Sequence, residues 1–202
     1  MLARKCLKIG LLIPHLARQG GDDTSYEGAT VIEPKKAYYE VPIATLDFAS
    51  LYPSIMQAHN LCYSTLVQPS DIPKLEQGSY ETSPCGNTFV VKKTQEGILP
   101  QILDELLAAR KKAKKDMAAT DDPHEKAVQN GRQLALKISA NSVYGFTGAT
   151  VGQLPCVPIA SSTTSYGRNL LLETRKFVEE TYTVLTYSLT HLLAHSLTHS
   201  LT

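Results

Sequence analysis

The chain has 202 residues, of which 43% are hydrophobic and 19% charged, and its formal net charge is +1. This balance is that of an ordinary globular domain, and it excludes an intrinsically disordered chain and a uniformly basic or acidic one. The four cysteines are widely spaced without a C-x-x-C pair, which fits a reducing compartment rather than a disulfide framework or a zinc site. We expect no signal peptide and no membrane span, because the apolar run near the N-terminus stops at Pro14.

The first third of the chain alternates between helical and strand-like patterns. Residues 2–13 repeat apolar side chains at helical spacing, which predicts a surface helix. The pair Asp22-Asp23 follows in a glycine-rich loop and is interpreted as solvated, with metal binding as the weaker alternative. Two strand-like runs, 29–33 and 37–41, then predict a hairpin.

A short apolar run, residues 43–46, predicts a buried strand that ends at Asp47. Ser50 then offers a cap for a helix over residues 51–58, with a proline tolerated in its first turn. A carboxylate at such a turn lies beside free backbone N–H groups, so it can face a metal ion while the amides face a phosphate. Simple capping of the helix explains Asp47 equally well from the local sequence.

The middle of the chain leads into its longest periodic segment. Turn-forming residues dominate 69–85, which predicts a connecting excursion, and residues 88–92 predict a short strand. Leucines and isoleucines then recur at helical spacing over 99–107. The same face continues into Arg110 and Lys114, so an apolar stripe becomes basic partway along one helix.

A break at residues 120–123 separates this helix from a second one, predicted over about 124–145. Two long helices joined by a short polar turn predict an antiparallel helical hairpin. The first helix carries five cations within residues 110–115, and most of them are interpreted as a solvated face.

The second helix carries a polar stripe. Lys137, Asn141 and Tyr144 lie at i, i+4 and i+7, while Leu134, Ile138 and the neighbouring alanines are expected to pack against the first helix. Ordinary polar decoration of a surface helix is the alternative. A polar stripe that faces the same way as the basic stripe of its partner is better explained by ligand binding than by packing.

The last third begins with turns over residues 145–158 and continues with a helix-compatible segment, 161–182. A four-residue Ser-Leu-Thr-His repeat follows. Its His191, His195 and His199 recur at i+4 and could face one metal ion. So regular a repeat is more typical of translated repetitive nucleotide sequence, which is the favoured interpretation.

Two strings carry a resemblance to a known family. Asp47-Phe-Ala-Ser-Leu-Tyr-Pro-Ser-Ile resembles motif A, and Lys137-Ile-Ser-Ala-Asn-Ser-Val-Tyr-Gly motif B, of the B-family (alpha-like) DNA polymerases. The likeness covers about residues 1–184 and implies an α+β fold, with a partial polymerase palm of antiparallel strands and helices and a two-helix antiparallel fingers hairpin. The implied divisions are a partial palm with motif A at 1–96, fingers with motif B at 97–145, a return to the palm at 146–184 and a low-complexity tail at 185–202.

The resemblance implies a DNA-directed DNA polymerase, a nucleotidyltransferase of DNA replication. Such an enzyme adds dNMP from a dNTP to a primer 3′-hydroxyl by phosphoryl transfer at two Mg²⁺ ions. Its partners would be primer–template DNA and dNTP and, in the full-length family member, accessory subunits and a sliding clamp. The resemblance also implies a nuclear location and no membrane partner.

The resemblance assigns roles residue by residue. Asp47 would hold both metal ions, with the backbone carbonyl of Phe48 as a further ligand, and Tyr52 would stack on the deoxyribose and exclude a 2′-hydroxyl. The other implied contacts are those of the Ser50 and Leu51 N–H groups with the β- and γ-phosphates, of Arg110, Lys114, Lys137 and Asn141 with the nucleotide, and of Tyr144 and Gly145 with the nascent base pair.

One family motif is not found. A Tyr-Gly-Asp-Thr-Asp-Ser string is expected shortly after Tyr182, where the histidine repeat runs instead, and none of Asp71, Asp104, Asp116 or Asp121 lies in such a string. One carboxylate does not anchor two Mg²⁺ ions. We therefore expect a fragment or mis-terminated gene model of a polymerase that is inactive alone. The alternatives are a noncatalytic nucleotide- or DNA-binding fragment and a chain that is not a stable product.

Overall fold

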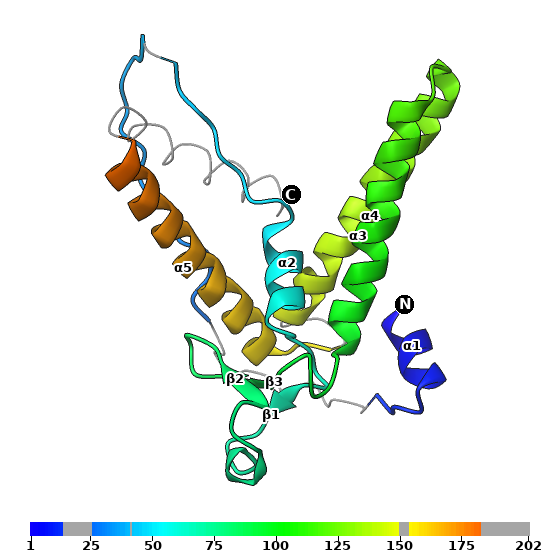
Figure 1. Cartoon of the computed structure of the whole chain (residues 1–202), viewed down its shortest axis with the longest axis vertical. Coiled ribbons are helices and arrows are strands. Elements are labelled where there is room, and N and C mark those ends of the chain that lie inside the picture. Colours follow the sequence, from blue (N-terminus) through cyan, green and yellow to red (C-terminus); the bar gives the residue numbers. More distant parts are fainter. Residues whose placement is uncertain (14–25, 41, 150–153, 183–202) are drawn as a thin grey trace.

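A computed structural model describes residues 1–13, 26–40, 42–149 and 154–182 of the chain. Within these ranges, five α-helices and a small antiparallel sheet confirm the α+β class. Figure 1 shows α2 standing between α5 and the long α3–α4 hairpin, with the sheet beneath them. The helices are α1 (Leu2–Lys8), α2 (Leu51–Ala58), α3 (Ile98–Ala119), α4 (Pro123–Gly148) and α5 (Val157–Thr181), and a 3₁₀ helix spans Ile72–Lys74.

The sheet has three short strands in the order β1-β3-β2, all antiparallel. They are β1 (Leu66–Val67), β2 (Tyr80–Thr82) and β3 (Thr88–Val90). The predicted strand at 88–92 is confirmed as β3, and its Phe89 is buried. β2 was missed because turn-forming residues surround it.

The strands predicted at 29–33, 37–41 and 43–46 are corrected by the structure. The described residues 26–40 and 42–48 form no strand. Ile43 and Leu46 are 44% and 45% exposed rather than buried. A strand forms only where a neighbour completes its backbone hydrogen bonds. The three strands of the described sheet pair only with one another. The segment before Asp47 therefore has no described strand beside it to complete its backbone hydrogen bonds, and its strand-like composition is not sufficient.

Helix α1 is shorter than predicted, because it ends at Lys8 and is followed by Gly10 with φ +72°. Cys6 is its buried residue, whereas Ile9 and Ile13 of the expected stripe are exposed. An ion pair of 2.7 Å between Lys5 Nζ and Glu105 Oε1 joins α1 to α3.

Helix α2 forms over the predicted residues, with Pro53 in its first turn. Ser50 stands at the N-cap in a left-handed conformation (φ 54°), and its side chain makes no capping bond to the described residues. Ile55 and Met56 turn into the core. This core lies at the foot of the molecule, where the end of α2, β3, the start of α3 and the start of α5 meet; its largest fully buried apolar side chains are Phe89, Met56, Leu61, Leu99, Ile102, Leu103 and Ile159.

The predicted antiparallel hairpin is confirmed as α3 and α4, which project away from the core together (Figure 1). The packing face of α4 was predicted only in part, because Ala140 is buried whereas Leu134 and Ile138 are 45% and 66% exposed. The buried residues are Gln133, Ala140, Val143 and Thr147. Small residues let the two backbones approach, so this stripe faces α3 although it is less apolar.

Helix α5 begins at Val157, four residues before the predicted start. Its first half buries Ser162, Thr163, Thr164 and Ser165 beside Ile159 and Ala160. The two threonine hydroxyls donate to carbonyls of the same helix, Thr163 Oγ1 to Ile159 O at 2.8 Å and Thr164 Oγ1 to Ala160 O at 3.3 Å. In its second half Leu171 and Val178 are buried, whereas Phe177 is exposed.

Two sequence features, the Asp22-Asp23 pair and the histidine repeat, lie outside the described residues. Among the helices that the structure describes, none combines the length and apolarity needed to cross a membrane.

Candidate active site

The site forms where α2 meets α4. The rings of Tyr52 and Tyr144 lie 4.5 Å apart between centroids and are tilted by 39°. Tyr52 stands in the first turn of α2 and Tyr144 in the last turns of α4, so two strings almost a hundred residues apart in sequence meet here. Tilted aromatic pairs at this separation are favourable contacts.

Sequence analysis missed a third tyrosine. The hydroxyl of Tyr26 lies 3.5 Å from that of Tyr144. Glycines make room for the cluster: a Cβ at Gly148 would overlap the Tyr26 hydroxyl, and one at Gly167 would come within 3.3 Å of Tyr52 Cε1. Tyr26 belongs to no periodic run, and the signal that could have found it is the Tyr-Glu-Gly-Ala turn that follows the glycine-rich loop.

Tyr52 and Tyr144 stay neutral. Burial raises the pKa of Tyr144, and the neighbouring Tyr26 raises it further. Burial also raises the pKa of Tyr52, with Tyr26 adding to the rise and the positive charge of Arg168 opposing it. The cluster therefore presents uncharged rings and hydroxyls at physiological pH.

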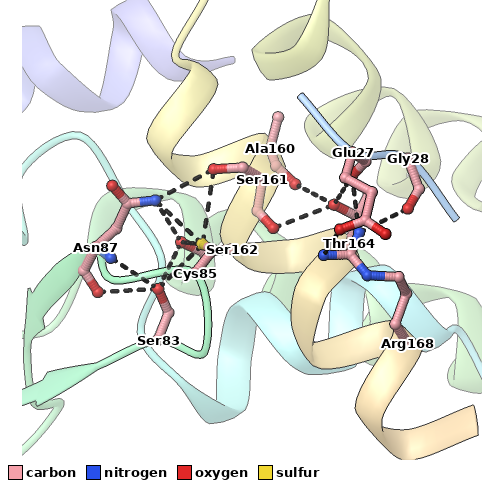
Figure 2. Close-up of polar contacts among 10 residues, drawn as sticks. All are labelled: Glu27, Gly28, Ser83, Cys85, Asn87, Ala160, Ser161, Ser162, Thr164 and Arg168. Atoms are coloured by element: carbon pink, nitrogen blue, oxygen red, sulfur yellow. Dashed lines mark hydrogen bonds and ion pairs between the residues drawn. The ribbon is translucent and has the colours of Figure 1, made fainter. Parts of the chain in front are cut away.

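Helix α5 holds the segment that carries Tyr26. Thr164 Oγ1 donates to the carbonyl of Glu27 at 2.9 Å, and Arg168 Nη1 donates to the carbonyls of Glu27 and Gly28 at 2.8 and 2.7 Å. Arg168 Nη2 also forms an ion pair of 3.0 Å with Glu27 Oε2. Figure 2 shows these contacts converging on the segment from one face of the helix. Sequence analysis did not single out Thr164 or Arg168, because neither lies in a motif.

Asp47 lies just before α2 and is exposed, and Phe48 is half-buried. No hydrogen bond or ion pair joins Asp47 to another residue of the described segments. Ser54 Oγ donates to Ala49 O at 3.1 Å and ties the turn to the helix. The first N–H groups of α2, beginning at Leu51, have no partner within the helix and can face an anion.

The donors around Asp47 fit a magnesium ion only in part. Its carboxylate and the carbonyl of Phe48 are hard oxygen ligands of the kind that Mg²⁺ prefers. The described residues contain no cluster of three or more His, Cys, Asp or Glu that could hold a metal ion. Asp47 therefore offers one carboxylate of a metal site rather than a complete set of ligands.

The cations of the hairpin form a row. Arg110 Nε donates to Gln133 Oε1 at 3.4 Å, which sets α3 and α4 in register. Lys114 then lies one helical turn farther from the core than Arg110, and Lys137 one turn nearer. Asn141 follows another turn down, directly above Tyr144.

Helical geometry places this row on one side of the hairpin. On α3, Arg110 and Lys114 lie beside the stripe that packs against α4, displaced from it in the direction in which the helix turns as residue numbers rise. Lys137 and Asn141 are displaced in the same direction from the packing stripe of α4. Because the helices are antiparallel, the two flanks lie on the same side. None of the three cations has an ion pair within the described segments, and Lys114 and Lys137 are exposed.

Gly145 completes the predicted set. It is exposed on α4 next to Tyr144, and a Cβ there would meet no described atom within 4 Å, so open surface lies above it. The structure thus joins Tyr52 and Tyr144 directly and aligns the cations above them. It places Asp47 just before the start of α2, with no hydrogen bond or ion pair to the cations among the described residues.

Comparison with known proteins identifies the class. The sequence profile of DNA polymerase family B matches residues 1–198. This chain therefore belongs to DNA polymerase family B.

Its curated relatives narrow the likeness. The chain is 59% identical over 186 residues to the DNA polymerase delta catalytic subunit of Arabidopsis thaliana, covering 91% of this chain and 17% of that protein. The subunit of the same name from Candida albicans is 58% identical over 183 residues (90% and 18%), and that from Bos taurus 55% over 185 (91% and 16%). The chain thus spans less than a fifth of the length of these relatives.

A solved structure agrees with the fold. The family B DNA polymerase from the hyperthermophilic archaeon Pyrobaculum calidifontis superimposes with a TM-score of 0.70 at 28% sequence identity. The match covers 90% of this chain and 23% of that one.

Proposed function

We propose that the chain is the nucleotide-binding part of a DNA-directed DNA polymerase of DNA replication. Residues 1–96 and 146–184 would belong to the palm and residues 97–145 to the fingers. The observation that carries the proposal is the contact between Tyr52 and Tyr144 at the foot of a row of unpaired cations. Such a row suits a triphosphate, and an aromatic platform at its foot suits a sugar and a base.

The cations would bind the triphosphate. Arg110, Lys114 and Lys137 follow one another at about 6 Å along the hairpin, the rise of four helical residues. Phosphate oxygens accept charge-assisted hydrogen bonds from such side chains, which are stronger than neutral ones. Asn141 would add a polar contact between the cations and the base of the site.

The tyrosines would select the nucleotide. The ring of Tyr144 packs against that of Tyr52 and would block its movement away from the nucleotide. Tyr52 would therefore contact the sugar and leave no room for a 2′-hydroxyl. Tyr144 and the open surface at Gly145 would lie under the nascent base pair. Selection would then depend on the shape of the pair rather than on its sequence.

Asp47 and the Phe48 carbonyl would hold Mg²⁺, and the N–H groups of Ser50 and Leu51 would face the β- and γ-phosphates. Bound magnesium would neutralise the charge that develops on the transferred phosphoryl group. Since Asp47 is the carboxylate that the described site contributes, turnover requires a second one. We therefore propose that the chain alone binds nucleotide and does not extend a primer.

The similarity to delta catalytic subunits extends the proposal to the partners. These are primer–template DNA and dNTP and, for a full-length protein, accessory subunits and a sliding clamp. A nuclear location follows from a role in replication.

The experiment is equilibrium binding of dATP and ATP to the purified chain with Mg²⁺. The expected result is tighter binding of dATP, a preference that Tyr52→Ala removes and Tyr52→Phe retains. Equal binding of the two nucleotides by the unaltered chain would contradict the proposed site.

A second candidate is a protein that binds nucleotide or DNA without catalysis, favoured by the single carboxylate of the described site. Primer extension with Mg²⁺ and all four dNTPs tests catalysis by the chain alone, which neither candidate expects, and extension that disappears in Asp47→Ala would contradict both. Binding of dATP with Mg²⁺ separates the two candidates. Asp47→Asn should weaken this binding if Asp47 holds the metal ion, whereas unchanged binding would favour the second candidate.

A further inference from the structure

One buried side chain joins the segment that follows α2 to the root of the hairpin, by which we mean the start of α3 and the end of α4. Asn60 is 1% exposed. Its Nδ2 donates to Val90 O at 2.7 Å and to Gln95 O at 2.8 Å, and its Oδ1 accepts from the Gly97 N–H at 2.8 Å. Asn60 has φ 53°, a left-handed conformation that asparagine tolerates better than most residues. Its three bonds fix β3, the following loop and the start of α3 to one point.

Cys62 holds the same root two residues later. The described residues provide no side-chain cap within α3 itself, and its Leu99 N–H donates instead to Cys62 Sγ at 3.4 Å. The packing leaves no space, because a Cβ at Gly97 would lie 2.7 Å from Cys62 Cβ. The first turn of α3 is therefore seated on residues that follow α2.

The other end of the hairpin is held by the next residue. Tyr63 Oη donates to Leu154 O at 2.5 Å, in the segment that returns from α4 to α5. The N–H of Cys156 donates to Thr147 O at 2.8 Å and ties this segment to the last turn of α4. Residues 60–63 thus contact both roots of the hairpin.

We propose that residues 60–63 are the pivot of the hairpin and that Asn60 is a positioning residue for nucleotide binding. Arg110 lies 13 residues beyond Gly97, about 20 Å along the helix at 1.5 Å per residue. A tilt of about 10° at the root would therefore move Arg110 by roughly 3 Å, enough to break a hydrogen bond to a phosphate. Since 60–63 directly follow α2, they set the cations relative to Asp47. This last step rests on the proposed function, and the pivot itself does not.

The test measures the distance between the hairpin tip and α5 in the full chain by double electron–electron resonance spectroscopy. Spin labels are attached at Asp121→Cys in the tip and Glu173→Cys on α5, in a background of Cys85→Ser and Cys156→Ser; Cys6 and Cys62 are buried and stay unlabelled. Asn60→Gly keeps the left-handed backbone and deletes the side-chain bonds. The expected result is a distance distribution at least twice as broad as in the parent chain.

The matched control is Asn87→Gly. Its Nδ2 also makes several bonds, to Pro158 O at 3.2 Å and to the hydroxyls of Ser161 and Ser162 at 3.1 Å, but these join the sheet to α5 (Figure 2). It should leave the tip distribution narrow. A second label pair, Ala58→Cys with Glu173→Cys, lies outside the hairpin and should stay narrow in both variants.

Three outcomes overturn the pivot: an unchanged tip in Asn60→Gly, equal broadening in Asn87→Gly, or equal broadening of the second pair. If Asn60→Gly melts without a cooperative transition, Tyr63→Phe replaces it, because this variant removes only the bond to Leu154 and should broaden the tip less. Adding dATP with Mg²⁺ separates the two proposals. The pivot is supported, and its link to nucleotide binding overturned, if Asn60→Gly broadens the tip distance distribution but dATP leaves the distribution of the parent chain unchanged.

Discussion

The core end of the molecule and the outer half of the hairpin, residues 107–136, satisfy their polar groups in different ways. At the core end, Asn60 and Arg168 each make two hydrogen bonds to backbone carbonyls of distant segments, and Thr164 makes one. In the outer half, the side-chain bond that joins α3 to α4 among the described residues is the long one from Arg110 to Gln133. The core end holds its polar groups in fixed positions, whereas the outer half carries exposed lysines, such as Lys111, Lys112 and Lys114, that form no ion pair within the described part of the chain.

The difference has a physical consequence. Buried polar groups with all partners in place stabilise one arrangement, because any movement leaves a desolvated donor or acceptor behind. Exposed cations without partners lose little when they move and gain much when an anion arrives. This combination suits the proposed site. The tyrosines Tyr52 and Tyr144, held in a fixed geometry, would contact the sugar, and the cations along the hairpin would bind the triphosphate.

The largest effect on stability is expected from shortening a side chain at the core end, compared with shortening one in the outer half. Met56 is 0% exposed at the core end, so Met56→Ala should lower the free energy of unfolding by about 3 kcal/mol. Leu134 is 45% exposed, so Leu134→Ala should change it by less than about 0.5 kcal/mol. Urea unfolding followed by circular dichroism measures both. Similar losses would show that Leu134 packs after all.

Two glycines give a contrast of opposite sign. A Cβ at Gly97 would lie 2.7 Å from that of Cys62, so Gly97→Ala should destabilise the chain by about 2 kcal/mol. A Cβ at Gly131 in the outer half would meet no described atom within 4 Å, so Gly131→Ala should stabilise α4 by about 0.8 kcal/mol. Thermal unfolding of the two variants tests the pair. Destabilisation by both would contradict the open surface at Gly131.

A gain of similar size is expected from removing an unpaired buried acceptor in the outer half. Gln129 Oε1 is buried and has no hydrogen-bond partner in the described part of the chain. A buried acceptor without a partner carries a desolvation penalty, so Gln129→Met, which keeps the side-chain length, should stabilise the hairpin by about 1 kcal/mol. Gln95→Met serves as the control, because Gln95 Nε2 donates to Ser64 O at 3.3 Å and loses a bond instead. A loss of stability in Gln129→Met would indicate a bound water at that oxygen.

The smallest effect concerns two thiols at the core end. Partial burial raises the pKa of Cys85, but hydrogen bonds from Ser162, Ser83 and Ser161 and from the Asn87 backbone lower it by more, so it falls below its usual value (Figure 2). Burial raises the pKa of Cys156.

A thiolate with a lower pKa is already present at lower pH, so alkylation of Cys85 by iodoacetamide should rise with pH earlier than that of Cys156. Mass spectrometry of the two modified peptides between pH 6 and 9, taken as a range of about three units around the ordinary thiol pKa, follows both rates. Ser162→Ala should move the Cys85 profile toward higher pH by a few tenths of a unit. Coincident profiles for the two thiols would contradict the role of the hydrogen bonds.

Local periodicity predicted the helices well. The stripe over 99–107 identified α3, and the break at 120–123 identified the turn, because these signals lie within one element. The face that α4 buries was predicted only in part, since Ala140 is buried as expected but the polar Gln133 and Thr147 are buried where Leu134 and Ile138 were expected. The strands expected before Asp47 failed for a related reason, because a strand depends on a neighbour that its own sequence does not contain.

The site divides in the same way. Tyr52 and Tyr144 could be named from their motifs, and the structure brings them into contact. Tyr26, Asn60 and Arg168 were invisible to the sequence analysis, because each acts through a bond to a backbone or hydroxyl group far along the chain. Positions that support a site are defined by tertiary contacts, and a motif records only the residues that face the ligand.

The central claim is that one flank of the hairpin binds the triphosphate. Binding of dATP with Mg²⁺ to the full chain is compared between two triple variants of equal charge: Arg110, Lys114 and Lys137 to Ala, and Lys111, Lys112 and Lys115 to Ala. These last three lysines are exposed on α3 away from α4. We expect the first variant to weaken binding by at least about a hundredfold, a loss of about 2.7 kcal/mol, and the second to weaken it less than about fivefold. Equal losses in the two variants would mean that charge alone attracts the nucleotide, and the flank would not be its site.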